Sequence, residues 1–515
     1  MPIPFKNEAM SDFSNPEINK KMQDALAKVK GEFGHEYSLV IGGERLKSTE
    51  KFTSTNPGNP SDVLGTFQKG KREHANTAIE TAWKSFKTWK TTPVEERAEL
   101  LFKIAQIMRD RKYELASWMV YEVGKSWTEA DGDVAEAIDF CDFYGREALR
   151  YAETQPVVAY PGENNESVYV PLGVGAVIPP WNFPLAILVG MTTAAVVSGN
   201  TVVLKPASDS PAIATKFMEI AEQAGVPAGV INLLTGSGAD VGETLVQSPL
   251  IRFITFTGSR EVGLHIIEEA GKTHPGQKWI KRVVAEMGGK DGIIVDDEAD
   301  VDAAVEGIAL AAFGYQGQKC SACSRAIVAE SVYDAFLVKL TERTKKITMG
   351  PVDNYDNFMG PVSSKSAFQK ISEYIEIGKT EGKLVTGGET QSENGYFIQP
   401  TIIADVKPTA RISLEEIFGP VLAVIPVKDY DEALAVANNT DYGLTGAVFS
   451  KNLEKIKRAK NEFHVGNLYL NRKCTGALVG VQPFGGFNMS GTDSKAGGRD
   501  YLLLFMQAKS ICEKL

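Results

Sequence analysis

Between residues 73 and 153 apolar and polar positions alternate with the period of consecutive amphipathic helices. In the stretch TTPVEERAELLFKIAQIM, apolar side chains recur every three or four positions, and we expect their shared face to lie in the core: Leu100, Leu101, Ile104, Ile107 and Met108. The start of this helix is predicted by a capping pattern, with Thr92 as the cap, Pro93 at the first helical position and Glu95 completing a capping box.

Between residues 172 and 287 the pattern changes to short apolar runs separated by helical stretches, one of which opens at Ser210-Pro211. The runs cover 174–178, 201–205, 230–234, 253–257 and 283–286. This alternation is typical of a parallel sheet with crossover helices. The longest apolar region, 185–204, is interrupted by Thr, Ser, Gly and Asn, so it predicts a buried helix followed by a strand rather than a membrane span.

The same alternation resumes at residue 291 with DGIIV, a helix over 300–313 and then RAIVAE. A second α/β unit is therefore predicted, with a boundary near 285–290. The Gly/Pro clusters STNPGNP and VQPFGGFNMSG predict structured turns rather than linkers. Residues 154–171 are predicted to form an extended arm.

The length and net charge of the chain exclude several classes of protein. A chain of 515 residues exceeds the size of a single core, so two or more domains are expected. A net charge of −10 provides no broad basic field for a nucleic-acid backbone, and no nucleic-acid partner is expected. The N-terminus lacks a basic start followed by an apolar core, so we expect a cytoplasmic protein without a membrane partner.

Cysteine usage raises the first chemical question. The chain has five cysteines, too few and odd in number for a disulfide framework, and its five histidines are scattered, so we expect reduced thiols and no metal site. Cys320 and Cys323 stand three apart in GYQGQKCSACSR. A redox pair normally opens a helix after a strand, and zinc would need a second pair. Two interpretations of Cys320 stay open: it is a nucleophile beside an uninvolved second cysteine, or it is an inert thiol.

A phosphate site is weakly indicated. The fingerprint G-x-G-x-x-G fails in GSGADVG, whose third glycine comes one place late, and in GVGAVIPP, which has none. In FITFTGSREVG an apolar strand ends at Thr257-Gly258-Ser259 and runs into a helix, whose free amides and dipole can bind a phosphate. Lys205 in VVLKPASDSP can reach a ribose or phosphate. An ordinary strand-to-helix turn and a solvated lysine explain the same residues.

A thiol that attacks a carbonyl needs a donor for the oxyanion and a base for water. Asn182 in PPWNFP lies on a turn just past an apolar strand, where its amide can donate. Glu286 in VVAEMGGK ends a strand before Gly288-Gly289, where the backbone can approach a substrate closely. A turn-forming asparagine and a solvated glutamate are the alternatives.

Six segments, PPWNFP, LKPAS, FTGSREVG, AEMGGKD, GQKC and EEIFGPV, resemble motifs of the NAD(P)-dependent aldehyde dehydrogenase superfamily in order and approximate spacing, over nearly the whole chain. Within it, GYQGQKCSACSR, EADGDVAEAIDF and TGALVGVQPFGG are most similar to the pyrroline-5-carboxylate dehydrogenases. The resemblance implies an α/β fold with a doubly wound dinucleotide-binding domain, a second α/β catalytic domain and a small oligomerisation arm. The implied ranges are 1–153 with 172–286, then 287–483, and 154–171 with 484–515 for the arm.

The resemblance also implies roles. Cys320 corresponds to the nucleophile, Glu286 to the general base and Asn182 to the oxyanion donor beside the Cys320 amide, which leaves Cys323 a bystander. The implied NAD-binding residues are Trp181, Lys205, Ser208, Thr257, Gly258, Ser259, Val262, Glu416 and Phe418. This sequence departs from the family pattern at one position. Ser208 lies three residues after Lys205, where NAD-preferring members usually carry Glu. Serine neither binds the ribose as strongly nor repels a 2′-phosphate, so we expect NADP to be tolerated.

For the substrate the resemblance implies L-glutamate 5-semialdehyde, which needs an anion cradle as well as aldehyde chemistry. Ser321 and the Gly476-Ala477 turn are expected at its carboxylate, Phe183 and Phe484 along its aliphatic middle, and Glu136 near its amino-acid end. The alternatives are another semialdehyde or simpler aldehyde, and a nucleotide-binding protein on the same fold without catalysis. At least a homodimer is implied.

Overall fold

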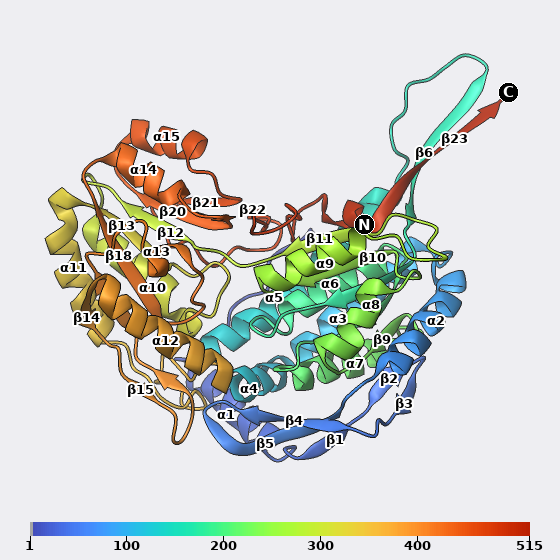
Figure 1. The fold of residues 1–515 in the computed structure, drawn as a ribbon. Helices are drawn as coiled ribbons and strands as arrows, with labels where there is room; N and C mark the ends of the chain where they lie inside the picture. Colours follow the sequence, from blue (N-terminus) through green and yellow to red (C-terminus); the bar gives the residue numbers. More distant parts are fainter. Residues whose placement is uncertain (1–3) are drawn as a thin grey trace.

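The computed structural model describes residues 4–515 and contains two α/β halves, each built on a seven-stranded sheet (Figure 1). The first sheet has the order β11-β10-β7-β8-β9-β2-β3. Its parallel strands are β7 (Val174–Ile178), β8 (Thr201–Leu204), β9 (Ile231–Leu233), β10 (Phe253–Thr257) and β11 (Arg282–Glu286). The five predicted apolar runs are these strands, so the parallel sheet is confirmed. β2 (Leu39–Ile41) and β3 (Glu44–Leu46) extend it with antiparallel pairing.

Helices pack around this sheet. The crossover helices include α6 (Ala186–Val197), α7 (Pro211–Ala224), the short α8 (Glu243–Gln247) and α9 (Arg260–Gly271). α7 opens at Ser210-Pro211, and residues 185–204 form a buried helix and then a strand, as predicted. The helical region 73–153 is confirmed as α2 (Arg72–Trp89), α3 (Val94–Asp110), α4 (Lys112–Val123) and α5 (Trp127–Ala152). α1 (Pro16–Lys30) packs on α4.

The predicted capping box of α3 is wrong. Pro93 is the N-cap residue rather than the first helical residue, and no side chain caps this end. The Thr92 hydroxyl instead donates to the Thr88 carbonyl at 3.4 Å, which closes the end of the preceding helix. The predicted core face is confirmed: Leu101, Ile104 and Met108 are fully buried, and the other two members pack against the same core.

The second sheet has the order β14-β17-β18-β13-β12-β20-β21 and is parallel except for β14 (Lys383–Thr386). The remaining strands are β12 (Gly292–Val295), β13 (Arg325–Ala329), β17 (Thr401–Ala404), β18 (Val421–Val427), β20 (Thr445–Phe449) and β21 (Asn467–Leu470). Its helices are α10 (Val301–Phe313), α11 (Glu330–Lys345), α12 (Lys365–Glu381), α13 (Arg411–Leu414), α14 (Tyr430–Asn438) and α15 (Leu453–Glu462). The second α/β unit is thereby confirmed.

Smaller sheets complete the fold. β4 (Lys51–Asn56) and β5 (Asn59–Gln68) join at the tight turn predicted from STNPGNP, and β1 (His35–Tyr37) pairs with β5. Two short pairs are β15 (Thr390–Gln391) with β16 (Phe397–Ile398), and β19 (Tyr442–Gly443) with β22 (Phe487–Asn488). Within residues 4–515, none of the helices combines the length and apolar character needed to cross a bilayer.

A two-stranded ribbon projects from the first half (Figure 1). It pairs β6 (Glu163–Pro171) with β23 (Met506–Lys514) in antiparallel register. The chain between the second sheet and β23 returns to the first half, where the buried turn Tyr501–Phe505 packs against α6. The last thirty or so residues therefore lie in two places. The part that ends at Phe505 packs against the first half, and the part from Met506 onward forms a strand of the ribbon.

Candidate active site

The loop that carries Cys320 follows α10 and is held in an unusual backbone conformation. Tyr315 and Gln316 have φ values of 50° and 56°, in the left-handed region that side chains other than glycine rarely adopt. The Tyr315 hydroxyl donates to the Val123 carbonyl at 3.2 Å, and Gln316 Nε2 donates to the Gly124 carbonyl at 2.9 Å. These bonds to the end of α4 stabilise the strained turn and fix the position of the following cysteine.

Cys320 lies between two cavities and lines both. One is a groove between the two halves, and the other is a pocket above α5 and α6. Burial raises the pKa of the Cys320 thiol well above its ordinary value, and the carboxyls of Glu286, Asp291 and Glu416 raise it further. Without ligands the thiol is therefore protonated at neutral pH, and its activation requires a proton acceptor or a change in its surroundings.

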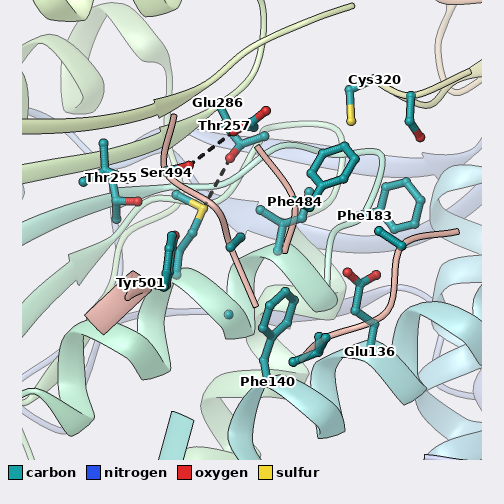
Figure 2. Close-up of a pocket in the computed structure, with 18 of the residues that line it drawn as sticks. Glu136, Phe140, Phe183, Thr255, Thr257, Glu286, Cys320, Phe484, Ser494 and Tyr501 are labelled. Atoms are coloured by element: carbon teal, nitrogen blue, oxygen red, sulfur yellow. Dashed lines mark hydrogen bonds between the residues drawn. The ribbon is translucent and has the colours of Figure 1, made fainter. Parts of the chain in front are cut away.

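Glu286 ends β11 and faces the pocket with Cys320. Its Oε2 accepts a hydrogen bond from the Ser494 hydroxyl at 3.2 Å, while the buried Oε1 has no partner among residues 4–515 (Figure 2). Burial raises the pKa of Glu286 to about 8. A carboxyl with this pKa can take up and release a proton near neutral pH, as a general base must.

Asn182 lies on the turn after β7, buried to 5% exposure, and lines the groove beside Cys320. Its amide Nδ2 donates to the Gln318 carbonyl at 3.1 Å, which holds the side chain against the cysteine loop. The Cys320 backbone amide makes no hydrogen bond to any described residue. Asn182 and this amide are thus the two donors available to an oxygen bound at the sulfur.

Seven of the nine predicted cofactor residues line the groove, which encloses about 660 Å³. They are Trp181, Thr257, Gly258, Ser259, Val262, Glu416 and Phe418. Ser259 caps α9, accepting from the Val262 amide, so the start of a helix faces the groove. A Cβ at Gly288 would overlap the Glu416 carboxylate, so glycine at this position lets the carboxylate keep its place against the backbone. Trp181 and Phe418 meet edge to face at 5.6 Å and join the two halves.

Lys205 and Ser208 are not among the residues that line the groove. Lys205 is 6% exposed, its amine donates to the Pro206 carbonyl at 3.2 Å, and burial lowers its pKa to about 8. Ala207 and Asp209, on either side of Ser208, line the groove instead. Lys370 on α12 also lines it. Sequence reasoning missed both residues: Asp209 directly follows the motif LKPAS within the stretch VVLKPASDSP, and Lys370 belongs to no motif that it used.

All six predicted substrate residues line the pocket: Glu136, Phe183, Ser321, Gly476, Ala477 and Phe484. In Figure 2 the rings of Phe183 and Phe484 lie between the Cys320 thiol and Glu136. Burial raises the pKa of Glu136 to about 8, with the neighbouring Asp133 as a second cause. The pocket also has walls that the sequence did not reveal, among them Phe140, Tyr144 and Tyr501. They lie on helix α5 and on the returning C-terminal chain, where they look like ordinary core residues.

A buried ion pair holds one wall of the pocket in position. The Lys125 ammonium lies 2.8 Å from Asp133 Oδ2, and both side chains are fully buried. The same ammonium lies 3.9 Å from the centroid of the Phe183 ring, close enough for a cation–π contact. Asp133 Oδ1 accepts from the Ala186 amide at 2.6 Å, which ties α5 to the start of α6. The pair therefore positions the wall formed by Phe183.

The comparisons with known proteins agree with this geometry. The model of the aldehyde dehydrogenase family matches residues 45–511. The chain belongs to the aldehyde dehydrogenase family. It is 56% identical over 510 residues to the 1-pyrroline-5-carboxylate dehydrogenase of Geobacillus sp. (strain WCH70), and 55% identical over 510 residues to that of Anoxybacillus flavithermus, covering 99% of each chain. The solved structure of the Thermus enzyme of the same name with bound NAD superposes with a TM-score of 0.98 at 53% identity, covering 100% of both chains.

The resemblance deduced from the six motifs is thus confirmed, and so is the aldehyde dehydrogenase fold class. In this aldehyde dehydrogenase the second cysteine of GYQGQKCSACSR lies away from both cavities. Cys323 is 2% exposed, and its thiol points to the Arg325 carbonyl at 3.5 Å. All five cysteines are free thiols. The geometry favours one nucleophile over a redox pair.

Of the described residues, one acidic group is compact enough to share a cation: Asp296, Asp297 and Glu298. In this aldehyde dehydrogenase the Lys455 ammonium pairs with all three, at 2.8, 2.5 and 3.4 Å. The group contributes to neither the groove nor the pocket.

Proposed function

We propose that this aldehyde dehydrogenase oxidises L-glutamate 5-semialdehyde to L-glutamate with NAD, in the breakdown of proline and arginine. The observation that supports this most is the pocket itself, which is lined by the Cys320 thiol, by the Gly476-Ala477 turn, whose backbone amides are unpaired among the described residues, and by aromatic walls. The semialdehyde forms from 1-pyrroline-5-carboxylate, the compound in the names of the relatives, by hydration and ring opening.

The groove suits a nicotinamide dinucleotide. The start of α9 with Ser259 offers backbone amides to a pyrophosphate, and Glu416 offers a carboxylate to ribose hydroxyls. Gly289 donates to Glu416 Oε1 at 3.0 Å and keeps that carboxylate oriented. When bound there, NAD supplies the oxidant that accepts a hydride from the aldehyde carbon.

The chain's own residues carry the remaining chemistry. The Cys320 sulfur, once deprotonated, bonds to the aldehyde carbon, while Asn182 Nδ2 and the Cys320 amide donate to the resulting oxyanion. After oxidation the carbon is held as a thioester. Glu286 takes a proton from a water molecule, whose oxygen then attacks the thioester carbon; the carbon–sulfur bond breaks, which releases the carboxylate product and restores the Cys320 thiolate.

Substrate recognition takes place at the far end of the pocket. The Ser321 hydroxyl and the amides of Gly476 and Ala477 bind the α-carboxylate, and Phe183 and Phe484 enclose the methylene groups. Gly476 has a φ of 78°, a conformation that favours glycine and turns the local amides toward one side. Glu136 accepts from the ammonium group, whose positive charge would lower the pKa of this buried carboxyl.

Steady-state kinetics across a panel of aldehydes test the proposal. We expect the specificity constant for glutamate semialdehyde to exceed that for propanal and pentanal by about 10² or more, because a simple aldehyde forms no bonds with the carboxylate site. Equal constants would contradict the proposed substrate. Another amino-acid or dicarboxylic semialdehyde with a higher constant would replace it while leaving the chemistry intact.

We further propose a cytoplasmic homodimer or higher homo-oligomer, with the domain ranges predicted from the sequence. The ribbon of β6 and β23 supports an assembly role, since within residues 4–515 its strands pair only with one another, and the preceding loop exposes Val158 to 92% and Tyr160 to 65%. Light scattering on the full chain and on a variant lacking residues 506–515 tests this. A mass equal to one chain for the intact protein would rule it out.

A further inference from the structure

The N-terminal segment, residues 5–11, lies along α5 and is held there by two buried aspartates. The Ser11 hydroxyl donates to Asp131 Oδ1 at 2.6 Å, and the Glu8 amide donates to Asp139 Oδ1 at 2.7 Å. The two aspartates are eight residues apart in one helix, which places them on one broad face of α5. Because a buried carboxylate without partners is costly, these bonds make the segment a fixed part of the fold.

Asn7 connects this segment to the chain that carries the Gly476-Ala477 turn. Its side-chain amide makes two hydrogen bonds: Nδ2 donates to Asp139 Oδ2 at 2.8 Å and to the Val479 carbonyl at 3.0 Å. Val479 lines the pocket and lies two residues after the turn. One side chain of the N-terminal segment therefore joins α5 to the loop that forms another wall of the pocket.

Phe5 adds an apolar contact to the same loop. Its ring meets the Phe143 ring of α5 edge to face, with 5.2 Å between the centroids. Both rings lie against Gly480, where an added Cβ would lie 3.1 Å from the Phe143 ring and 3.2 Å from the Phe5 ring. The Asn7 bond and this contact therefore hold two consecutive residues of the loop, Val479 and Gly480.

The two stretches joined in this way supply both ends of the proposed amino-acid site. Asp139 belongs to EADGDVAEAIDF, which also contains Glu136, and the loop TGALVGVQPFGG contains the Gly476-Ala477 turn. Under the proposed function Glu136 binds the ammonium group and the turn binds the α-carboxylate. Both groups are bonded to one carbon atom, so their separation is fixed, and the protein must hold α5 and the turn at a matching distance. The N-terminal segment contacts both.

We propose that the N-terminal segment determines substrate specificity in this enzyme, with Asn7 as the positioning residue that sets the Gly476-Ala477 amides for an α-amino carboxylate. The inference rests on the proposed function for the identity of the substrate. Asn7 lines neither the pocket nor the groove, so it acts through Val479 rather than on the substrate. A displacement of about 1 Å in a supporting contact is enough to weaken a site. Loss of the Asn7 amide should therefore weaken carboxylate binding and leave the chemistry at Cys320 intact.

Steady-state kinetics of Asn7→Ala with two aldehydes test this. We expect the KM for glutamate semialdehyde to rise by about fivefold to tenfold, with kcat changed by less than about twofold. Propanal, which lacks a carboxylate, should be oxidised with the wild-type constants, and the Kd of NAD measured by calorimetry should not change. Asn7→Asp keeps the shape of the side chain, removes the donor and adds a charge beside Asp139, so its KM should rise at least as much.

Hydrogen–deuterium exchange without substrate gives an independent readout. The amides of Gly480 and Gln482 donate to the carbonyls of Gly497 and Leu478, so they are protected while the loop keeps its place. We expect exchange over residues 478–482 to accelerate by about tenfold in Asn7→Ala. Unchanged exchange would contradict the positioning role. A wild-type enzyme that does not prefer glutamate semialdehyde to propanal would contradict the proposed function, and kinetics alone report that failure.

Two further variants control the result. Ser11→Ala removes one hydrogen bond of the same segment to Asp131 and leaves the bond to Val479, so its KM and exchange should match the wild type. Phe5→Leu disturbs the packing on Gly480 but keeps the Asn7 bonds, and its KM should rise by about threefold even if Asn7→Ala fails to fold. A KM within about twofold of wild type in Asn7→Asp and Phe5→Leu, with thermal unfolding unaltered, would overturn the proposal. An equal rise of KM in Ser11→Ala would overturn it as well.

Discussion

The groove and the pocket meet at Cys320 but are built differently. Most of the groove comes from turns that directly follow neighbouring parallel strands, such as Trp181 after β7 and Ser259 after β10. The pocket combines α5, the start of α6, the cysteine loop and the chain from 476 to 501, which are far apart in sequence. Strand ends of an open α/β sheet form a ligand site wherever the sheet forms. The pocket exists only when distant segments pack correctly.

The two regions also differ in how they hold negative charge. In the pocket, Glu136 and Glu286 both have pKa values raised to about 8 by burial, so neither is fully ionised at neutral pH. In the groove, burial also raises the pKa of Glu416 and of Asp209, but the Gly289 amide donates to Glu416 and favours its ionised form, and Asp209 is open to a ligand. The pocket is thus suited to proton transfer, and the groove to binding hydroxyl groups. Substitutions that affect one region and spare the other test this division.

The sharpest test is Cys320→Ala, which removes the atom common to both regions. We expect aldehyde oxidation to fall by more than about 10³-fold, since no other thiol reaches the pocket, while NAD still binds the groove. Single-turnover NADH formation and calorimetric NAD binding measure the two effects. The matched control is Cys323→Ala, whose thiol is buried elsewhere; it should retain activity within about twofold. An equal loss of aldehyde oxidation in both variants would favour a redox pair of Cys320 and Cys323 instead.

The next largest effect is expected for Glu286→Gln. Loss of the Glu286 carboxylate should slow product release by about 10²- to 10⁴-fold. The first turnover should still produce NADH, so a burst of NADH should remain. Because the pKa of Glu286 is raised to about 8, the ionised base increases as the pH rises toward and through that value. Wild-type turnover limited by release should therefore increase from about pH 6.5 to about pH 9, and this dependence should vanish in Glu286→Gln.

Ser494→Ala sharpens the assignment of that pH dependence. The Ser494 hydroxyl donates to Glu286 Oε2 and thereby lowers its pKa against the effect of burial. Removing the hydroxyl should shift the pH profile to higher values and leave its height at high pH nearly unchanged. A profile that does not move would mean that another group titrates.

Asn182→Ala should slow the first turnover, rather than product release, by about 10²- to 10³-fold, less than the largest effect expected for Glu286→Gln. Its amide is one of two donors at the sulfur, so the Cys320 backbone amide still supports part of the reaction. Stopped-flow measurement of the NADH burst reports this step. Asn182→Asp keeps the shape, removes the donor and adds an opposing charge, so it should lose at least as much. A burst within about threefold of wild type in both variants would exclude the proposed oxyanion role.

The contrast between groove and pocket also explains what could be predicted from the sequence. The parallel strands were evident as apolar runs because both faces of such strands are buried, and the turns after them could be located from the strand ends. β2 and β3 were missed because they are three residues long and join the sheet by antiparallel pairing. The capping box at Thr92 failed because that hydroxyl bonds to the preceding helix, a contact that no local pattern encodes.

At the site, the six expected pocket residues came from resemblance to a family rather than from any periodicity. Glu136 illustrates the reason, because on sequence alone it is one of many acidic residues in α5, and only the packing of the 476–484 chain over that helix makes it part of a cavity. Asp209 shows a different limit of sequence-based prediction. Its strand and turn were predicted, but which of two adjacent side chains faces the groove depends on backbone angles within the turn.

The most selective effect is expected for Ser321→Ala. Ser321 is 8% exposed and lines the pocket, and its hydroxyl oxygen forms no hydrogen bond with another described residue, so it is available to the substrate carboxylate. Loss of one hydrogen bond to a charged group should raise KM for glutamate semialdehyde by about tenfold and change kcat by less than about twofold. Propanal, which has no carboxylate, should be oxidised at the wild-type rate, and NAD affinity should not change, because Ser321 does not line the groove. Equal losses for both aldehydes would mean that the substitution displaces the adjacent Cys320, and the pocket would then lack the selective end that distinguishes it from the groove.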